Sequence, residues 1–316
     1  MRVILGWRGL AEDERGASIA IGNFDGVHRG HQEVIAAARR AADTLQVPLA
    51  AAVLDPHPRR WFQPEAPPFR LTSDVQRARA LAALGVERLH VLPFEAEMAA
   101  MSDEDFARSV LAGGLGARHV AAGFDFTFGR GRSGDGDLLK AYGARLGFGV
   151  SVVGEVADAE GLKLSSTSVR LALEAGRPEQ AAAVLSRPFA IEGEVVHGDK
   201  RGRELGFPTA NVRLGDYLRP RFGVYATRTR LPDGRVLPGV SSLGVRPMFE
   251  TPEPLLEVWL FDFDGDLYGR TIETELVAFL RPEARFDSLE ALKEAVGRDA
   301  VVARRLLGVP EQQPLC

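Results

Sequence analysis

The sequence predicts an α/β domain built on a doubly wound parallel sheet, followed by a smaller domain of antiparallel strands. The 316 residues are long for one hydrophobic core, which favours two domains. In the first half, apolar runs alternate with helical patterns, as in parallel sheets covered by helices on both faces. After Arg187-Pro188 the pattern changes to short alternating segments between Pro and Gly turns, which favours an antiparallel barrel or sandwich. We therefore expect one domain over residues 1–186 and a second over 187–316.

The first-half strands are expected where short runs are continuously apolar. These runs are residues 18–21, 49–54, 89–92, 119–122 and 150–153. Helices are expected between them, at residues 32–45, 72–84, 103–111 and 136–146, with two more at 169–173 and 179–185. Ser102, which precedes Asp103 and Asp105, is predicted to cap the third of these helices.

The second-half strands are expected where apolar and polar residues alternate. These segments are residues 190–196, 223–230, 235–245, 255–263 and 271–280. Asp233-Gly234 lies between two of them and is a strong hairpin signal. One helix is expected over residues 288–307, and the tail from residue 310 is expected to be loose.

Composition limits the classes of partner and the compartment. The sequence is 45% apolar and 26% charged with a net charge of −4, which gives no electrostatic reason to expect nucleic acid as a partner. Cys316 is the one cysteine, so disulfides within the chain and cysteine-based metal sites are excluded. No apolar run approaches the ~20 residues that span a membrane, and the start does not resemble a signal peptide. We expect a cytoplasmic protein with no membrane partner.

A glycine-rich turn, Gly22-Asn23-Phe24-Asp25-Gly26-Val27-His28-Arg29-Gly30-His31, joins the first strand to the first helix. The free N–H groups and the dipole of a helix N-terminus favour an anion, so this turn is a candidate phosphate site. His28 and His31 can donate hydrogen bonds to that anion. The alternatives are an ordinary turn of a doubly wound domain, or metal binding. Metal binding is disfavoured, because the histidines lack the i, i+4 spacing of common zinc pairs, although Glu33 is near.

Two later clusters also indicate phosphate chemistry. Ser165-Ser166-Thr167-Ser168 precedes Arg170 by one turn, which suits either a helix cap or a phosphate clamp. The run Gly206-Phe207-Pro208-Thr209-Ala210-Asn211 follows a stretch rich in glycine and charge, which is either an exposed loop or an anion nest. Thr209 and Asn211 place two hard oxygen donors on one face of a strand, where they suit Mg²⁺. Glu257 shares a face with Trp259 and is either a rim charge or a general base beside a bound ring.

These motifs resemble two known families. The first turn together with the serine-rich cluster is similar to the HxGH-type nucleotidyltransferases, and specifically to the FMN adenylyltransferase module of bacterial bifunctional FAD synthetases. Asp55-Pro56-His57-Pro58, Arg70-Leu71-Thr72 and the run at 123–130 resemble that module too, although His57 also suits a structural turn. The Gly-Phe-Pro-Thr-Ala-Asn run resembles the riboflavin kinase signature. The resemblance covers residues 17–307 and implies a Rossmann-like sheet followed by a β-barrel with a C-terminal helix.

The resemblance also implies site residues. In the first domain it assigns His28 and His31 to the ATP phosphates as catalytic residues, and the other nucleotide-binding residues are Gly22, Asn23, Phe24, Gly30, Asp125, Ser166, Thr167 and Arg170. In the second domain, Thr209 and Asn211 hold Mg²⁺–ATP, and Glu257 takes the proton of the ribityl 5′-hydroxyl. Further binding residues there are Gly198, Lys200, Gly206 and Pro208. Met248 departs from the family, which usually has threonine at that position, and this puts kinase efficiency in question.

The function implied is the phosphorylation of riboflavin to FMN by the second domain, with ATP and Mg²⁺. The first domain then adenylylates FMN to FAD and releases pyrophosphate. Riboflavin, FMN and ATP are the expected partners of a monomer or weak homo-oligomer. The alternatives are an adenylyltransferase with a weakened kinase barrel, a non-catalytic flavin-binding or sensing protein, and a nucleotidyltransferase acting on another phosphate ester.

Overall fold

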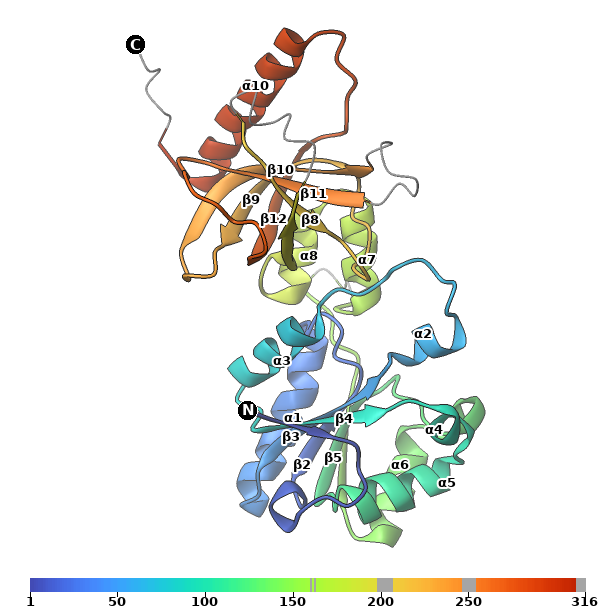
Figure 1. Cartoon of the computed structure of the whole chain (residues 1–316). Coiled ribbons are helices and arrows are strands. Elements are labelled where there is room, and N and C mark those ends of the chain that lie inside the picture. The colour runs from blue at the N-terminus through green and yellow to red at the C-terminus, as the bar shows by residue number, and fades with distance from the viewer. Residues whose placement is uncertain (160, 162, 198–206, 246–253, 311–316) are drawn as a thin grey trace. The chain divides into compact units, whose positions relative to one another are not determined.

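The computed structural model describes residues 1–159, 161, 163–197, 207–245 and 254–310 (Figure 1). The chain packs into two compact units. The first comprises Met1–Pro67 and Asp74–Ser165, and the second comprises Pro68–Ser73 and Ser166–Cys316. A short segment from the N-terminal half of the sequence therefore belongs to the second unit.

The first unit contains a six-stranded parallel sheet in the order β1-β4-β3-β2-β5-β6. Its strands are β1 (Arg2–Leu5), β2 (Ser18–Ile21), β3 (Leu49–Asp55), β4 (Arg88–Pro93), β5 (His119–Gly123) and β6 (Gly149–Val153). The order reverses beside β2, since the chain moves outward through β3 and β4 and then returns to β5. Ligands of doubly wound sheets bind at such a reversal, beyond the carboxyl ends of the strands. The predicted parallel sheet is confirmed, and β1 is an edge strand that the sequence reasoning did not anticipate.

Helices cover both faces of this sheet (Figure 1). They are α1 (Arg29–Leu45), α2 (Pro58–Phe62), α3 (Asp74–Ala83), α4 (Ala96–Ala100), α5 (Asp103–Asp105) and α6 (Gly136–Leu146), with a π-helical segment η2 (Phe106–Gly114) and 3₁₀ turns at Glu12–Glu14 and Arg130–Arg132. Alternate strand residues supply two apolar cores. Ala20 and Val53 contribute to the core beneath α1 and α3, whereas Ile19 and Ala52 contribute to the core beneath η2 and α6.

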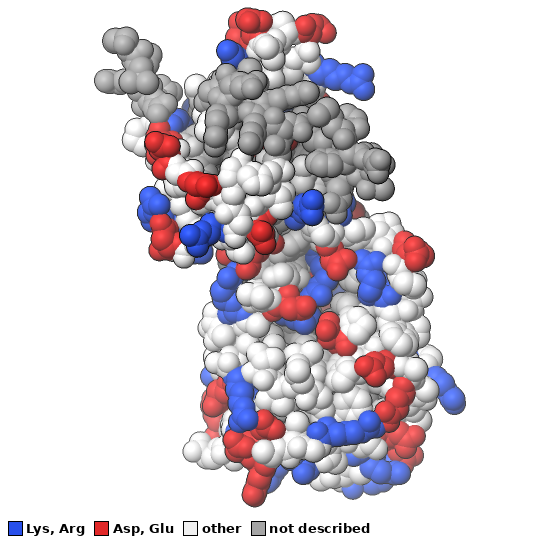
Figure 2. Space-filling view, in the orientation of Figure 1, with Lys and Arg blue, Asp and Glu red and all other residues white. Residues whose placement is uncertain are grey.

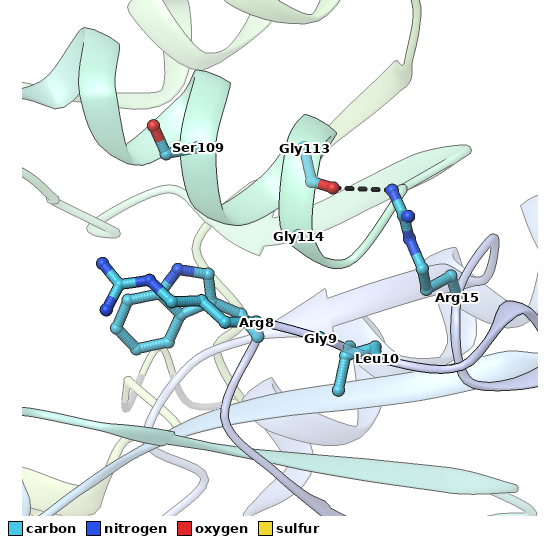
Figure 3. Close-up of a pocket in the computed structure, with 8 residues that line it drawn as sticks. Arg8, Gly9, Leu10, Arg15, Ser109, Gly113 and Gly114 are labelled. Atoms are coloured by element: carbon cyan, nitrogen blue, oxygen red, sulfur yellow. Dashed lines mark hydrogen bonds between the residues drawn. The ribbon is translucent and has the colours of Figure 1, made fainter.

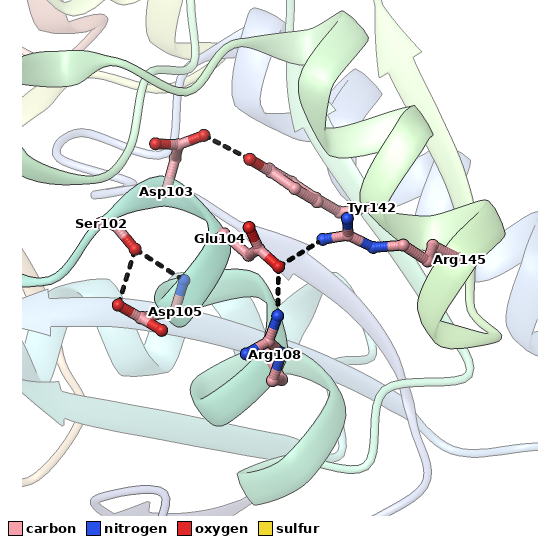
Figure 4. A network of polar contacts seen from close by, with 7 residues as sticks. All are labelled: Ser102, Asp103, Glu104, Asp105, Arg108, Tyr142 and Arg145. Carbon is pink, nitrogen blue, oxygen red and sulfur yellow. Dashed lines mark hydrogen bonds and ion pairs between the residues drawn. The ribbon is translucent and has the colours of Figure 1, made fainter.

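A polar network joins α5 to α6 at the surface (Figure 4). Ser102 caps α5 as expected, since its hydroxyl accepts the Asp105 N–H at 3.0 Å. The Tyr142 hydroxyl donates to Asp103 at 2.5 Å, which lowers the pKa of Asp103 and raises that of Tyr142. Glu104 accepts from Arg108 of η2 and from Arg145 of α6, so the network also links η2 to α6.

The second unit is a closed antiparallel barrel in the order β10-β11-β8-β7-β12-β9. Its strands are β7 (Phe189–Val196), β8 (Ala210–Arg213), β9 (Gly223–Arg230), β10 (Val236–Val245), β11 (Pro254–Leu260) and β12 (Thr271–Arg281). The Asp233-Gly234 hairpin is confirmed between β9 and β10, with Gly234 at a φ of 88°. A closed barrel leaves no unpaired sheet edge, which distinguishes it from the sandwich.

Within the described ranges, three helices complete this unit: α7 (Ser166–Glu174), α8 (Pro178–Leu185) and α10 (Leu289–Leu307). Helix α8 packs against β7 and β12, and α7 packs against α8. Helix α10 covers the outer barrel face around Val240 and Phe261. Arg281 on β12 fixes α10 to the barrel through three hydrogen bonds of 2.7 to 3.0 Å to the Asp299 carboxylate.

Candidate active sites

The Gly22–His31 turn lies between β2 and α1, at the reversal point of the sheet. His28 is the N-cap of α1, and its Nδ1 accepts the His31 N–H at 3.3 Å. In a neutral imidazole this leaves the ring proton on Nε2. The two rings stack with centroids 3.6 Å apart and an interplanar angle of 23°. The predicted pair of histidines is therefore brought together at a helix N-terminus, where an anion is favoured.

The backbone of this turn is held in an unusual conformation. Phe24 and Val27 have positive φ angles of 51° and 45°, which are uncommon for residues other than glycine and are most unfavourable for a β-branched side chain. Phe24 is fully buried, and its ring packs edge-on to His31 with centroids 5.2 Å apart. The buried Phe24 thus anchors a strained turn that sets the position of His31.

Gly30 leaves no room for a side chain. A Cβ at this position would lie 2.7 Å from the Leu164 carbonyl oxygen and 3.1 Å from two atoms of the His28 ring. Glycine at position 30 is therefore required by the close packing of the turn against the chain at Leu164, next to the serine-rich cluster.

Arg77 is a site-adjacent residue that sequence reasoning missed. It is buried on α3, donates to the Asn23 carbonyl oxygen at 3.3 Å and pairs with Asp74 at 2.8 Å. It thus fixes the turn and adds a positive charge beside it. The contact between Arg77 and Asn23 joins residues 54 positions apart, so no local motif indicates it. The one signal in the sequence is a charged residue at a buried position of the helix.

Asp125 and His57 lie in loops at the carboxyl ends of two strands. Asp125 is exposed in the turn after β5, the neighbour of β2 at the reversal point. His57 caps the short helix α2, since its Nδ1 accepts the Arg59 N–H at 3.1 Å. This capping contact fits the structural interpretation of His57.

The serine-rich cluster forms the first turn of α7. Ser166 and Thr167 begin the helix, and Arg170 follows one turn later. The Arg170 Nε–H donates to the Phe69 carbonyl oxygen at 2.9 Å, and its guanidinium lies 5.6 Å from the Phe69 ring centroid. These residues belong to the second unit, whereas His28 and His31 belong to the first. Their action as one clamp stays a prediction.

Two of the predicted kinase residues, Asn211 and Glu257, lie on one row across the barrel. Glu257 on β11 lies directly opposite Asn211 on β8 and Ser242 on β10. Directly opposed residues of antiparallel strands share a face, so the three side chains are neighbours. Ser242 was not predicted, because its place depends on strand register and not on a local motif. Asn211 is buried, and Glu257 and Ser242 are half-buried.

An aromatic surface lies beside this row. Trp259 is two residues from Glu257 on the same face and packs against the core beneath α10. The Phe207 and Trp259 rings meet edge-on with centroids 4.7 Å apart. A carboxylate beside aromatic rings suits a substrate with a flat ring and a hydroxyl tail.

Magnesium fits the residues predicted to hold it. Thr209 and Asn211 offer a hydroxyl and an amide oxygen, with the Glu257 carboxylate opposite Asn211. These are hard oxygen donors, and Mg²⁺ usually takes few protein ligands and completes its shell with phosphates and waters. No group of three His, Cys, Asp or Glu side chains suited to a metal occurs in the described part of the chain. Pro208 is exposed beside Thr209. Gly198, Lys200, Gly206 and Met248 lie outside the described residues.

A hollow of about 420 Å³ in the first unit contains none of the predicted site residues (Figure 3). Arg8 lies over the Trp7 ring at 4.9 Å, and Arg15 donates to the Gly113 carbonyl oxygen at 2.6 Å. Arg8 is also paired with Glu97. None of the residues that line the hollow belongs to the strand-end turn that carries the histidines.

Acidic and basic side chains are interspersed on the face shown in Figure 2, rather than gathered into a patch of one sign. None of the helices within the described ranges is long and apolar enough to cross a membrane.

Comparison with known proteins identifies both halves of the chain. Residues 10–168 match the family model of FAD synthetase, and residues 185–307 match that of riboflavin kinase. Curated relatives named bifunctional riboflavin kinase/FMN adenylyltransferase match nearly end to end. The Pseudomonas fluorescens protein is 43% identical, covering 97% of this chain and 98% of the relative. The Escherichia coli K12 protein is 38% identical, covering 98% and 99%.

A solved structure is also similar over the whole length. It is described as a macrolide-efflux protein from Streptococcus pneumoniae and matches with a TM-score of 0.85 at 30% identity, covering 96% of this chain and 99% of the other. That description applies to the other protein. The two family models and the curated relatives show that the chain belongs to the family of bifunctional riboflavin kinase/FMN adenylyltransferases.

Proposed function

We propose that this chain makes FAD from riboflavin in two consecutive transfers, each with its own set of residues. The kinase residues are Asn211 and Glu257 on the barrel, with Thr209 beside them, and the adenylyl-transfer residues are His28 and His31. The observation that carries the assignment is the presence of both arrangements in one chain: stacked histidines at a helix N-terminus, and an amide–carboxylate pair in register on adjacent strands.

In the kinase reaction, the 5′-hydroxyl of riboflavin attacks the γ-phosphorus of ATP, and the bond from that phosphorus to the β,γ-bridging oxygen breaks. Glu257 accepts the hydroxyl proton, and FMN and ADP leave. Trp259 and Phe207 provide an apolar surface for the flavin ring beside Glu257. Thr209 and Asn211 hold Mg²⁺, which when bound neutralises charge on the phosphates.

In the adenylyl transfer, a phosphate oxygen of FMN attacks the α-phosphorus of ATP, and the bond to pyrophosphate breaks. The incoming phosphate is itself the nucleophile, so no protein nucleophile is needed. His28 and His31 donate hydrogen bonds to phosphate oxygens whose negative charge grows during the transfer. Gly22, Asn23, Phe24 and Gly30 shape the turn that presents these histidines.

The remaining assignments of the adenylyl-transfer site are Ser166, Thr167 and Arg170 as a second phosphate clamp and Asp125 as a further nucleotide contact. Gly198, Lys200, Gly206 and Pro208 are proposed to bind phosphate in the kinase site. A cytoplasmic location is also proposed, because a chain with a single cysteine suits a reducing compartment. A monomer or weak homo-oligomer is the proposed assembly.

Chromatographic separation of riboflavin, FMN and FAD over time tests the function. With riboflavin, ATP and Mg²⁺, FMN should rise first and FAD should follow, and chelation of Mg²⁺ should stop the first step. If riboflavin gives no FMN while added FMN still gives FAD, the chain is an adenylyltransferase with an inactive barrel. The Met248 departure is the observation that favours this second candidate.

A further inference from the structure

The segment Pro68–Ser73 lies between α2 and α3 in the sequence, yet it packs as part of the barrel unit. The Arg70 N–H donates to the Asp216 carbonyl oxygen at 3.1 Å, and the Leu218 N–H donates to the Arg70 carbonyl oxygen at 2.8 Å. These two bonds form a short parallel bridge at Tyr217. The segment is therefore bonded to the loop that follows β8, the strand that carries Asn211.

Tyr217 ties this bridge to the barrel. Its side chain is buried, and its hydroxyl oxygen accepts the Glu192 N–H of β7 at 3.2 Å. Ser73, at the end of the segment, also hydrogen-bonds to the same phenol. The Tyr217 ring meets Phe189 edge-on with centroids 6.3 Å apart. One hydroxyl thus joins β7 to the 68–73 segment.

The other end of the segment holds Arg170. Phe69 is buried, and its carbonyl oxygen accepts from the Arg170 Nε at 2.9 Å while its ring lies beside the guanidinium. An arginine side chain is long and loses much rotamer freedom when it binds. The bond to Nε fixes the plane of the guanidinium, and so the direction of its two terminal amino groups. A bidentate contact to phosphate depends on that direction.

We infer that Phe69 and Tyr217 are positioning residues for Arg170, so that a loop of the kinase barrel, acting through the 68–73 segment, orients a phosphate-binding guanidinium of the adenylyl transfer. The inference rests on the proposed role of Arg170. It predicts that a change in the barrel at Tyr217 impairs FAD formation from FMN and spares FMN formation from riboflavin.

The test uses Tyr217→Phe and Phe69→Leu in the full chain, with both activities measured on the same preparation. Each variant should lower kcat/KM of adenylyl transfer about 3- to 10-fold, the size expected for one lost hydrogen bond or cation–π contact. Kinase kcat/KM should change less than about 2-fold. Tyr142→Phe is the matched control, because it removes a phenol hydrogen bond, to Asp103 in the first unit, and Tyr142 is none of the proposed site residues. Melting temperatures of all variants identify any general loss of structure.

Arg170→Ala separates positioning from a structural effect. Alone it should lower adenylyl transfer about 100-fold. If Tyr217 acts through Arg170, the double variant Tyr217→Phe/Arg170→Ala should be no slower than Arg170→Ala. Losses that multiply, an equal loss of both activities, or wild-type rates in Tyr217→Phe would overturn the inference and leave the role of Arg170 intact. Wild-type adenylyl transfer in Arg170→Ala would overturn both.

Discussion

At the scale of single residues, the histidine turn has no room for a side chain at Gly30. Replacing it with alanine would push a Cβ against a backbone oxygen and the His28 ring. We expect Gly30→Ala to cost about 1–3 kcal/mol of first-unit stability and to lower FAD formation at least about 10-fold, because His28 must move. FMN formation should persist. Product analysis and denaturant unfolding measure the two effects.

Gly297→Ala provides the matched control. Gly297 also lies inside a helix, α10, but a Cβ there would meet nothing within 4 Å. The change should be neutral or stabilise the protein by up to about 1 kcal/mol. Equal behaviour of the two variants would contradict the steric account of Gly30.

Single residues also show which site candidates the sequence can indicate and which it cannot. His28, His31, Asn211 and Glu257 could be proposed as candidates because each belongs to a local motif or a strand alternation. Ser242 could not, since its place opposite Glu257 depends on the register of two strands that the sequence does not state.

At the scale of elements, α10 is held on the barrel by a largely buried ion pair. The Asp299 side chain is 10% exposed and binds Arg281 of β12. Asp299→Ala would leave the arginine charge without this partner, and we expect a loss of about 3 kcal/mol in barrel stability. FMN formation should fall before FAD formation, because α10 covers the face that carries Trp259. Chemical denaturation with both assays measures this.

Glu294→Ala on the same helix is the control for Asp299→Ala. Glu294 pairs with Arg298, but both side chains are at least 70% exposed. Exposed pairs contribute little, so this change should cost less than about 0.5 kcal/mol. A comparable loss in both variants would show that helix charge, and not the buried pair, matters.

Strand β4 carries a buried histidine that should make the first unit sensitive to acid. Burial, with a smaller contribution from Arg88, lowers the pKa of His90 from 6.5 to about 4, and neither ring nitrogen has a hydrogen-bond partner within the described residues. The folded state disfavours the protonated ring. The contribution of neutral His90 to the free energy of unfolding is therefore complete above pH 6.5 and is lost as the pH falls toward 4, by about 3 kcal/mol in total.

Urea unfolding between pH 4 and pH 7.5 tests this effect. His90→Leu should flatten the pH dependence and keep stability at pH 7, because no hydrogen bond within the described residues is lost. The exposed His197 serves as the control position, where His197→Gln should leave the profile unchanged. If the free energy of unfolding of His90→Leu depends on pH as steeply as that of the wild type, the acid sensitivity comes from other groups.

Most elements were predictable because their periodicity is strong. The helix at 136–146 and the strands at 18–21 and 223–230 were predicted with the bounds that the structure has. Strand β1 was not, since only Ile4 of its four residues is buried, so the usual apolar run is absent. The apolar periodicity of residues 103–111 predicts a helix, but it does not show that α5 continues as the π-helical η2.

At the scale of the whole molecule, the chain combines two folds, and the predicted adenylyl-transfer residues are divided between the two units. The parallel sheet presents the histidine turn at its reversal point, and the barrel presents the Asn211–Glu257 pair on its outer face. The two architectures and the family could be predicted from the sequence. The membership of 68–73 in the barrel unit could not, because it depends on contacts between distant segments.

The central claim is that two independent sites share one chain. His28→Asn tests it well, because asparagine retains a helix N-cap but has no imidazole. Glu257→Gln is its counterpart, since it keeps the shape of the side chain and removes the base. Both variants are incubated with ATP and Mg²⁺ and either riboflavin or FMN, and the three flavins are separated over time.

We predict that His28→Asn accumulates FMN from riboflavin and forms FAD at least about 100-fold more slowly than the wild type. Glu257→Gln should form FMN about 100-fold more slowly and convert added FMN to FAD at the wild-type rate. If either folded variant loses both activities to the same extent, the two sites are not independent and the account is contradicted.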